Sequence, residues 1–298
     1  MKTIFLIGNE TPMDLLLLSL FLKGKPQGEL ILGVKRDTPL NWKKLLKVWK
    51  IFRASGSYFV GFNVVLNSKK GLMFMQDSNI IPPDVETMRQ EYKFPLFYFH
   101  DVNAPRTLSI IKDFAPDVIF NHMPQRICLP LIQIPPLGIV NIHPGLLPEY
   151  QGMGSCLWPL INKAHFQGVT LHYIDSEEID AGPIIASGRF PIKEKDSVLS
   201  LHIKNRIVAA VVANYIANRF FRNEAVKSKP QGGGEYHKLP QKKSLRLMRN
   251  MGHKYISWND RKILSENMIG NLDFFDETTG WKWKQYNHKG NQERILKK

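Results

Sequence analysis

The segment Gly138-Ile-Val-Asn-Ile-His-Pro-Gly-Leu-Leu-Pro-Glu-Tyr-Gln-Gly152 decides how this sequence of 298 residues is interpreted. It begins as an apolar strand in which Asn141 and His143 point to the same side, and Pro144 ends the strand directly after them. Polar side chains at the carboxyl end of a parallel strand lie where α/β sheets bind their ligands. A single His there is more often structural than catalytic. The pair therefore predicts a ligand site more strongly than His143 alone.

Short apolar runs alternate with helical patterns on both sides of this segment, which is typical of a parallel sheet covered on both faces. We expect strands at Thr3–Gly8, Leu30–Val34, Phe94–Phe99, Val118–Asn121, Ile139–His143, Val169–Ile174 and Ile184–Phe190. Apolar periodicity predicts helices at Met13–Leu22, Asn41–Phe52, Arg106–Phe114 and Leu199–Phe221. Residues 57–75 fit neither pattern. The expected fold class is α/β, with a Rossmann-like, mostly parallel sheet, helices on both faces and a small C-terminal appendage.

Charge is distributed unevenly along the chain. The 41 Lys and Arg residues against 26 Asp and Glu give a net charge of +15. Residues 1–56 carry +6 and residues 201–298 carry +12, whereas residues 101–200 carry −3. The segment Lys227–Gly234, with three consecutive glycines, predicts a linker or exposed loop. We therefore expect a main domain over residues 1–226 and a small basic region over residues 227–298.

Several classes of protein are excluded by composition. A hydrophobic fraction of 43% can fill a core, and no run of 18 apolar residues would span a bilayer. Asn9, Glu10 and Asp14 interrupt the apolar start before any cleavage site, so we interpret it as a buried first strand rather than a signal peptide. Two cysteines cannot form a disulfide framework or a zinc knuckle. A cytoplasmic location is the default expectation.

A second informative segment runs from Gly168-Val-Thr-Leu-His172 through an acidic loop to Asp180-Ala-Gly-Pro-Ile. The acidic residues Asp175, Glu177 and Glu178 have the usual pattern of solvated charges. Asp180 differs because an apolar residue and a tight turn flank it, which predicts a fixed and partly buried carboxylate. A buried carboxylate needs a partner, and His143 is the obvious candidate.

Together the two segments resemble the folate-dependent formyltransferase superfamily, which includes glycinamide ribonucleotide, methionyl-tRNA and amino-sugar formyltransferases. The resemblance covers roughly residues 1–220 and is strongest over residues 116–192. It implies that residues 1–226 form the catalytic domain, and that Asn141, His143 and Asp180 transfer a formyl group from N10-formyltetrahydrofolate to a primary amine without a metal. The Asn141 amide and a protonated His143 would stabilise the tetrahedral oxyanion, and Asp180 would orient the imidazolium.

The same resemblance implies the folate contacts less specifically. The expected contacts are Gln125, Arg126, Ile127 and Cys128 after the preceding strand, Gly145, Leu146, Leu147 and Pro148 in the turn, and Glu177, Glu178 and Ile179 in the acidic loop. That loop is one residue longer than the common family form, so either Glu177 or Glu178 could face the folate. Gly145 stands where many members have Ser, and this difference puts none of the roles named above in doubt.

The acceptor is less constrained than the chemistry. The basic C-terminal region would suit a methionyl-tRNA formyltransferase, but the 64 residues after the glycines are too few for that family's C-terminal barrel. We therefore favour a small or nucleotide-linked amine, with an amino sugar as the leading candidate. A formyltetrahydrofolate hydrolase and a non-catalytic binding protein that keeps the fold are the alternatives. The oligomeric state is not indicated.

The basic helix expected over Asn41–Phe52 carries Lys43, Lys44, Lys47 and Lys50 among apolar residues. The commoner interpretation is a helix that covers the sheet and exposes a solvated face. The alternative is a helix that lies on an anionic membrane, which would make the protein peripheral to the inner face of the membrane. The basic ends of the chain are also compatible with RNA contact.

Overall fold

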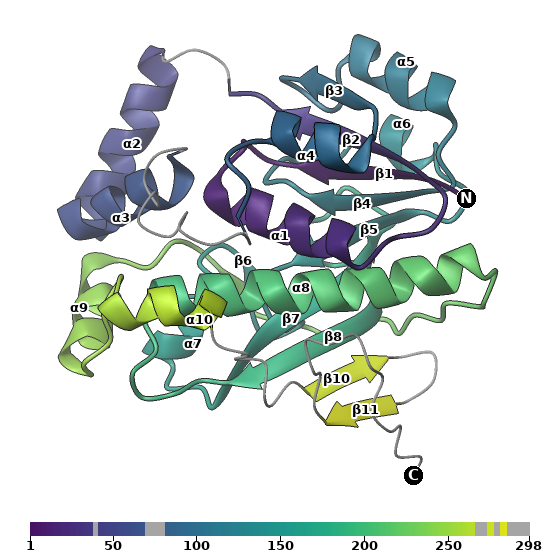
Figure 1. Ribbon diagram of the computed structural model, residues 1–298. Coiled ribbons are helices and arrows are strands. Elements are labelled where there is room, and N and C mark those ends of the chain that lie inside the picture. Colours follow the sequence, from purple (N-terminus) through teal and green to yellow (C-terminus); the bar gives the residue numbers. More distant parts are fainter. Residues whose placement is uncertain (38–40, 69–80, 266–272, 277–280, 285–298) are drawn as a thin grey trace.

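The computed structural model describes all residues except 38–40, 69–80, 266–272, 277–280 and 285–298 (Figure 1). Its described strands are β1 (Lys2–Ile7), β2 (Glu29–Lys35), β3 (Leu96–Phe99), β4 (Val118–His122), β5 (Ile139–His143), β6 (Gln151–Gly152), β7 (Phe166–Ile174), β8 (Ile184–Pro191), β9 (Tyr236–His237), β10 (Asp273–Asp276) and β11 (Trp281–Lys284). All seven strands expected from the sequence are present.

The main sheet has the strand order β11-β10-β8-β7-β5-β4-β1-β2-β3. Five neighbouring strands are parallel to one another, in the spatial order β5-β4-β1-β2-β3. This confirms the expected Rossmann-like architecture. From β5 outward the pairing changes, because β7, β8, β10 and β11 each lie antiparallel to their neighbour. β5 is therefore the strand at which the parallel part of the sheet meets the antiparallel part.

Helices lie on both faces of the sheet (Figure 1). They are α1 (Pro12–Lys23), α2 (Trp42–Ser55), α3 (Ser57–Asn67), α4 (Val85–Tyr92), α5 (Pro105–Phe114), α6 (Leu129–Ile132), α7 (Trp158–Ile161), α8 (Val198–Phe221), α9 (Lys242–Asn250) and α10 (Lys262–Ser265), with a 3-10 turn at Trp258–Arg261. The four expected helices are present. Residues 57–67, which fitted neither pattern, form α3, and the remainder of the ambiguous segment includes residues outside the described part of the chain.

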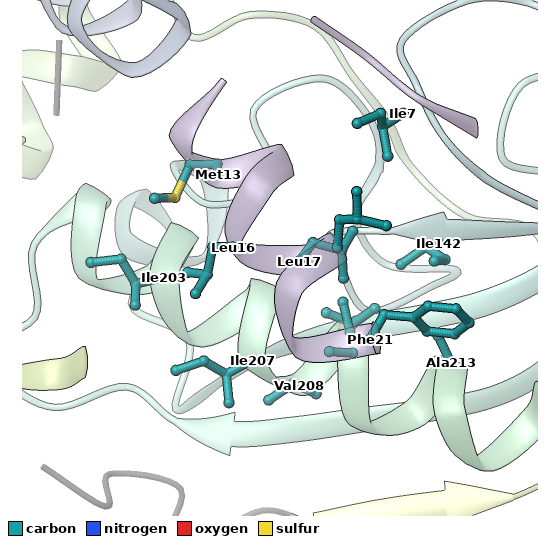
Figure 2. Packing of buried hydrophobic residues seen from close by; sticks show 14 of the residues in the cluster. Ile7, Met13, Leu16, Leu17, Phe21, Ile142, Ile203, Ile207, Val208 and Ala213 are labelled. Atoms are coloured by element: carbon teal, nitrogen blue, oxygen red, sulfur yellow. The ribbon is translucent and has the colours of Figure 1, made fainter. Parts of the chain in front are cut away.

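Strand alternation divides the core into two layers. Phe5 and Ile7 point toward α1 and α8, whereas Ile4 and Leu6 point toward the side that α5 and α6 cover. Figure 2 shows the first layer, in which apolar side chains of α1 and α8 meet those at the ends of β1 and β5. Both helices are buried over most of their surface, as their apolar sequences predict. These two helices fix the carboxyl ends of the central strands.

The chain after α8 returns across this end of the sheet. Lys229 pairs with Ile184 of β8, and β9 pairs with β6 through Gln151 and Gly152. The segment Lys227–Gly234 is exposed except for Gln231, which is half-buried. Val226, directly before it, is also half-buried. Residues 236 and 237 thus lie beside the loop that follows β5. The division of the chain at residue 226 stays a prediction.

Candidate active site

The register of the central strands brings five polar residues to one edge of the sheet. Asn121 of β4 lies beside Asn141 of β5. On the other side, the antiparallel pairing of β5 with β7 sets His172 opposite Asn141 and Thr170 opposite His143. Residues directly opposite each other in adjacent strands have side chains on the same face. A cluster of amide, imidazole and hydroxyl groups follows from this register.

Asp180 closes the cluster from the loop between β7 and β8. Its carboxylate lies 3.3 Å from His143 Nδ1 and 3.7 Å from His172 Nε2. It also accepts hydrogen bonds from the backbone N–H of Gly152 at 2.9 Å and from Asn141 Nδ2 at 3.5 Å. The side chain of Asp180 is 10% exposed and that of His143 is 4% exposed. The sequence therefore predicted both the burial of this carboxylate and its partner.

The surroundings of Asp180 favour its ionised form. Burial by itself would raise the pKa of Asp180, but the hydrogen bond from His143, the nearby imidazole of His172 and the charge of His143 outweigh it. The pKa of this carboxyl is held well below its usual range. Asp180 is thus a fixed negative charge at the site throughout the neutral pH range.

Asn141 is held by a chain of hydrogen bonds across three strands. Its Oδ1 accepts from Asn121 Nδ2 at 2.7 Å, and its Nδ2 donates to His172 Nε2 at 3.0 Å. His172 Nδ1 donates in turn to the carbonyl of Tyr173 at 2.9 Å. The second N–H of the Asn141 amide makes only the long contact to Asp180, so it is the donor most readily available to another acceptor.

His143 faces an oxygen acceptor at each ring nitrogen. Nδ1 faces the Asp180 carboxylate, and Nε2 lies 2.8 Å from the carbonyl oxygen of Tyr150. The ring satisfies both acceptors only when both nitrogens carry hydrogen. Gly145 gives this ring its space, because a Cβ there would lie 2.9 Å from His143 Nε2 and 3.1 Å from the Tyr150 carbonyl. Besides its expected place at the folate site, the glycine therefore makes room for the His143 imidazole.

Two residues of the second segment act as supports that sequence reasoning missed. Thr170 Oγ1 donates to the carbonyl of Gly145 at 2.8 Å and accepts from the N–H of Leu147 at 3.0 Å, which fixes the turn after β5. His172 orients the Asn141 amide. The sequence signal for both residues was the pattern Gly-Val-Thr-x-His. In a β-strand, its Thr170 and His172 lie on the same side because they are two residues apart. Only the antiparallel register assigns their partners.

The family model described as Formyl transferase matches residues 67–216, which is half of the chain. The chain belongs to the formyltransferase family. The match includes β5, β7, the Asp180 loop and most of α8, so all five residues of the cluster lie within it.

Curated relatives of this formyltransferase domain occur in longer proteins. The chain is 32% identical over 135 residues to a bifunctional polymyxin resistance protein ArnA of Wigglesworthia glossinidia brevipalpis. It is 30% identical over 155 residues to a methionyl-tRNA formyltransferase of Pelobacter propionicus. These matches cover 45% and 51% of this chain, but only 20% and 47% of the relatives. The chain thus spans less than half the length of either.

A solved structure supports the same fold. An N-formyltransferase from Helicobacter canadensis, determined with folinic acid and dTDP-3-aminofucose, superposes with a TM-score of 0.53 at 17% identity. The superposition covers 86% of this chain and 81% of that one. At this identity the likeness concerns the fold alone. Among the described residues, no helix is long and apolar enough to cross a membrane.

Two loops expected at the folate site of this formyltransferase lie against each other. Arg126 Nε donates to the carbonyl of Glu177 at 2.9 Å, and its guanidinium lies 3.4 Å from the Glu177 carboxylate. Glu177 also accepts from the N–H of Leu129 at 3.0 Å. Glu178 and Ile179 are exposed. Of the two candidate glutamates, Glu177 is engaged within the protein.

The other residues of the first loop differ in their surroundings. Gln125 Nε2 donates to the side chain of Asp101, and Cys128 donates its N–H to Asn103 at 2.9 Å. Ile127 is buried against the α5 layer of the core. Hydrogen bonds to Asp101 and Asn103, which precede α5, therefore fix the position of this loop.

The turn after β5 forms the third expected part of the folate site. Gly145 and Leu147 are buried, and Leu146 and Pro148 are half-buried. Gly234 of the C-terminal segment passes so close to the Pro148 carbonyl that a Cβ would collide with it. The segment predicted as a linker thus lies against this turn.

Gln231 of the same segment contacts the Asp180 loop directly. Its Nε2 donates to the carbonyl of Asp180 at 3.0 Å and to that of Gly182, and its Oε1 lies 3.4 Å from Gln151 Nε2. Asp180 itself has a φ of 54°, in the left-handed region that Asp tolerates better than most residues. Gln231 is therefore a support for the carboxylate that no local motif indicated.

A second group of buried titratable residues comprises Asp14 of α1, His122 of β4, and His202 and Arg206 of α8. Burial raises the pKa of Asp14 to about 6, although Arg206 partly offsets the effect. Burial, together with the charge of Arg206, lowers the pKa of His202 to about 3 and that of His122 well below its usual value. Nε and Nη1 of Arg206 have no hydrogen-bond partner among the described residues. Because folding shifts the pKa values of Asp14, His122 and His202, the stability of the protein depends on pH.

Proposed function

We propose that this chain transfers a formyl group from N10-formyltetrahydrofolate to a primary amine. The observation that carries the proposal is the ionised, buried Asp180 beside His143, with Asn141 next to them. An ion-paired imidazole and an amide donor at one point suit a reaction in which an oxyanion develops and a proton moves. Membership of the formyltransferase family supports the same reaction.

The residues present fit the folate co-substrate. The loops Gln125–Cys128 and Glu177–Ile179 are joined through Arg126, and both border the Asp180 turn. Since Glu177 is engaged with Arg126 and Leu129, we assign Glu178 as the acidic residue free to face the pterin. The co-substrate supplies the activated formyl carbon. The protein residues position it and handle charge and protons.

Each member of the trio has a distinct task. The weakly engaged N–H of Asn141 is the donor that turns from Asp180 toward the developing oxyanion. His143 shifts its Nε2–H from the Tyr150 carbonyl toward the reacting atoms and donates to the oxyanion. When the bond between the formyl carbon and N10 breaks, His143 gives this proton to N10, and the proton lost by the amine restores the imidazolium. Asp180 keeps its charge throughout and stabilises the imidazolium.

The proposed acceptor is an amine on a nucleotide-linked sugar. Support comes from the positive charge of the chain ends, which suits a diphosphate, and from the solved relative that holds dTDP-3-aminofucose. The close approach of Gly234 to Pro148 also places the C-terminal segment against the site, where it can contact an acceptor. Two free cysteines are in keeping with a reducing, cytoplasmic setting.

A panel of acceptors tests the proposal. The full chain is incubated with N10-formyltetrahydrofolate and either no amine, nucleotide-linked amino sugars, glycinamide ribonucleotide or methionyl-tRNA, and tetrahydrofolate formation is followed. We expect turnover only with an amine and fastest with an amino sugar. Equal turnover without any amine would instead identify a hydrolase, and fastest turnover with methionyl-tRNA would reassign the acceptor.

A further inference from the structure

Helix α2 does not cover the sheet, contrary to the commoner interpretation of its sequence. Of its residues only Ser55 is buried. The large apolar side chains instead face outward, with exposed fractions of 80% for Trp42, 55% for Leu46, 51% for Trp49 and 47% for Phe52. A monomeric protein rarely exposes so many large apolar side chains on one element. This helix needs a partner outside the described residues of the chain.

The exposed apolar residues of α2 form one face. They recur at helical spacing along it, at Trp42, Leu45, Leu46, Trp49 and Phe52. The same periodicity puts Lys43, Lys47 and Lys50 on the opposite face. The Arg53 guanidinium lies over the Trp49 ring, 4.8 Å from its centroid. An apolar face rich in Trp with a face rich in Lys is typical of helices that lie in a membrane interface.

Helix α9 contributes further positive charge close to the end of α2. Ser55 Oγ donates to the carbonyl of Pro240 at 2.8 Å, and the Arg249 guanidinium lies 5.0 Å from the centre of the Tyr58 ring in α3. Tyr58 is itself 71% exposed. The exposed basic residues of α9 are Lys242, Lys243, Arg246 and Arg249. We call the exposed residues of α2, Tyr58 and these four residues the α2–α9 surface.

All charged residues of the α2–α9 surface are basic. The sequence contains no acidic residue between Asp37 and Asp77, and none between Glu235 and Asp260. A second copy of the chain would repel this surface if it presented the same face. Nucleic acid would match the charge, but it would leave the aliphatic side chains Leu45 and Leu46 in water.

We propose that the α2–α9 surface docks on an anionic lipid bilayer, with the apolar face of α2 in the headgroup region. Lipid acyl chains cover the apolar residues, and anionic headgroups attract the lysines and arginines. The proposal is independent of the formyl transfer proposed above. Figure 1 shows α2, α3 and α9 at the end of the molecule where α1 begins and β6 lies, which is the end that carries the candidate active site. Docking therefore brings that site close to the membrane.

Vesicle sedimentation with the full chain tests the proposal. Vesicles of phosphatidylcholine alone are compared with vesicles of phosphatidylcholine and phosphatidylglycerol in equal amounts. We expect binding to the anionic vesicles only, and a loss of at least ~10-fold in partitioning for the double variant Lys47→Glu/Lys50→Glu, since each basic residue near such a surface contributes appreciably. The matched control is Arg106→Glu/Lys112→Glu on α5, which should bind like wild type.

A second measurement separates insertion from charge attraction alone. Anionic vesicles should shift the tryptophan emission of the wild type to shorter wavelength, and Trp42→Phe/Trp49→Phe should lose most of that shift while still sedimenting. The thermal midpoint of each variant shows whether it is folded. Binding to neutral and anionic vesicles alike, no binding to either, wild-type partitioning of Lys47→Glu/Lys50→Glu, or preference for single-stranded RNA over anionic vesicles would each overturn the proposal.

Discussion

Replacing Asp180 by Asn removes one charge from the candidate active site and almost no volume. The amide oxygen of the new side chain can still accept the Gly152 N–H, which lies 2.9 Å from the carboxylate. The amide nitrogen would then face His143 Nδ1, at the position where the carboxylate oxygen lies 3.3 Å away. Two donors would meet there if His143 is protonated, so the imidazolium loses its partner and gains a repulsive contact.

The size of the effect follows from these contacts. A buried hydrogen bond to a charged group contributes about 1.5–3 kcal/mol, and removing one oxyanion donor or the acid–base help of one residue slows a reaction by about 100-fold or more. We therefore expect Asp180→Asn to lower kcat by at least ~100-fold. Because the substitution leaves the folate loops intact, KM for the formyl donor should change much less.

The assay is steady-state formation of tetrahydrofolate with a saturating amine acceptor. Asp175→Asn is the matched control, because this carboxylate lies in the same loop but is exposed. The control should retain wild-type turnover. Wild-type kcat in a folded Asp180→Asn variant would refute the role that we give to this carboxylate.

Three further substitutions test the supports of the site and the second group of buried titratable residues. Gly145→Ala should lower kcat by at least ~10-fold, because the added methyl displaces the His143 ring from its resting hydrogen bond; Gly232→Ala, where a Cβ meets nothing, is its control. Gln231→Ala should lower kcat by up to ~10-fold with little change in thermal midpoint, and Gln231→Glu, which loses the two donors, should not restore it. His202, whose pKa burial lowers to about 3 from 6.5, contributes stability in full above about pH 6.5 and loses it as pH falls toward 3. Urea unfolding should therefore show a loss of up to about 2 kcal/mol from this residue between pH 6.5 and about 5, which His202→Leu removes; an equal loss in wild type and variant would contradict this.

Most of the parallel sheet could be predicted from the sequence because its strands are short, apolar and separated by helical patterns. The pairing of β6 with β9 could not, since each strand has two residues and they meet only after the chain returns. Helix α2 marks another limit. Its periodicity predicts an apolar face, but only the tertiary structure shows that this face points to solvent.

The candidate active site divides in the same way. Asn141 and His143 could be predicted because they share one side of a strand that Pro144 ends, and Asp180 because it precedes a tight Ala-Gly-Pro turn. The structure brings the three together. The supports Thr170 and Gln231 could not. The task of Thr170 depends on an antiparallel register, and that of Gln231 depends on a distant segment that returns to the site. The local pattern Gly-Val-Thr-x-His marks Thr170 without naming its partners, and no local pattern marks Gln231.

The most direct test of the account follows the formyl group itself. The full chain is given N10-formyltetrahydrofolate labelled with ¹³C in the formyl group, together with a nucleotide-linked amino sugar, and the products are resolved by mass spectrometry. We expect the label to appear on the amine nitrogen in step with tetrahydrofolate formation, and at least ~100-fold more slowly with Asp180→Asn. Label that remains on the folate, or that appears as free formate at the same rate with and without the amine, would contradict it.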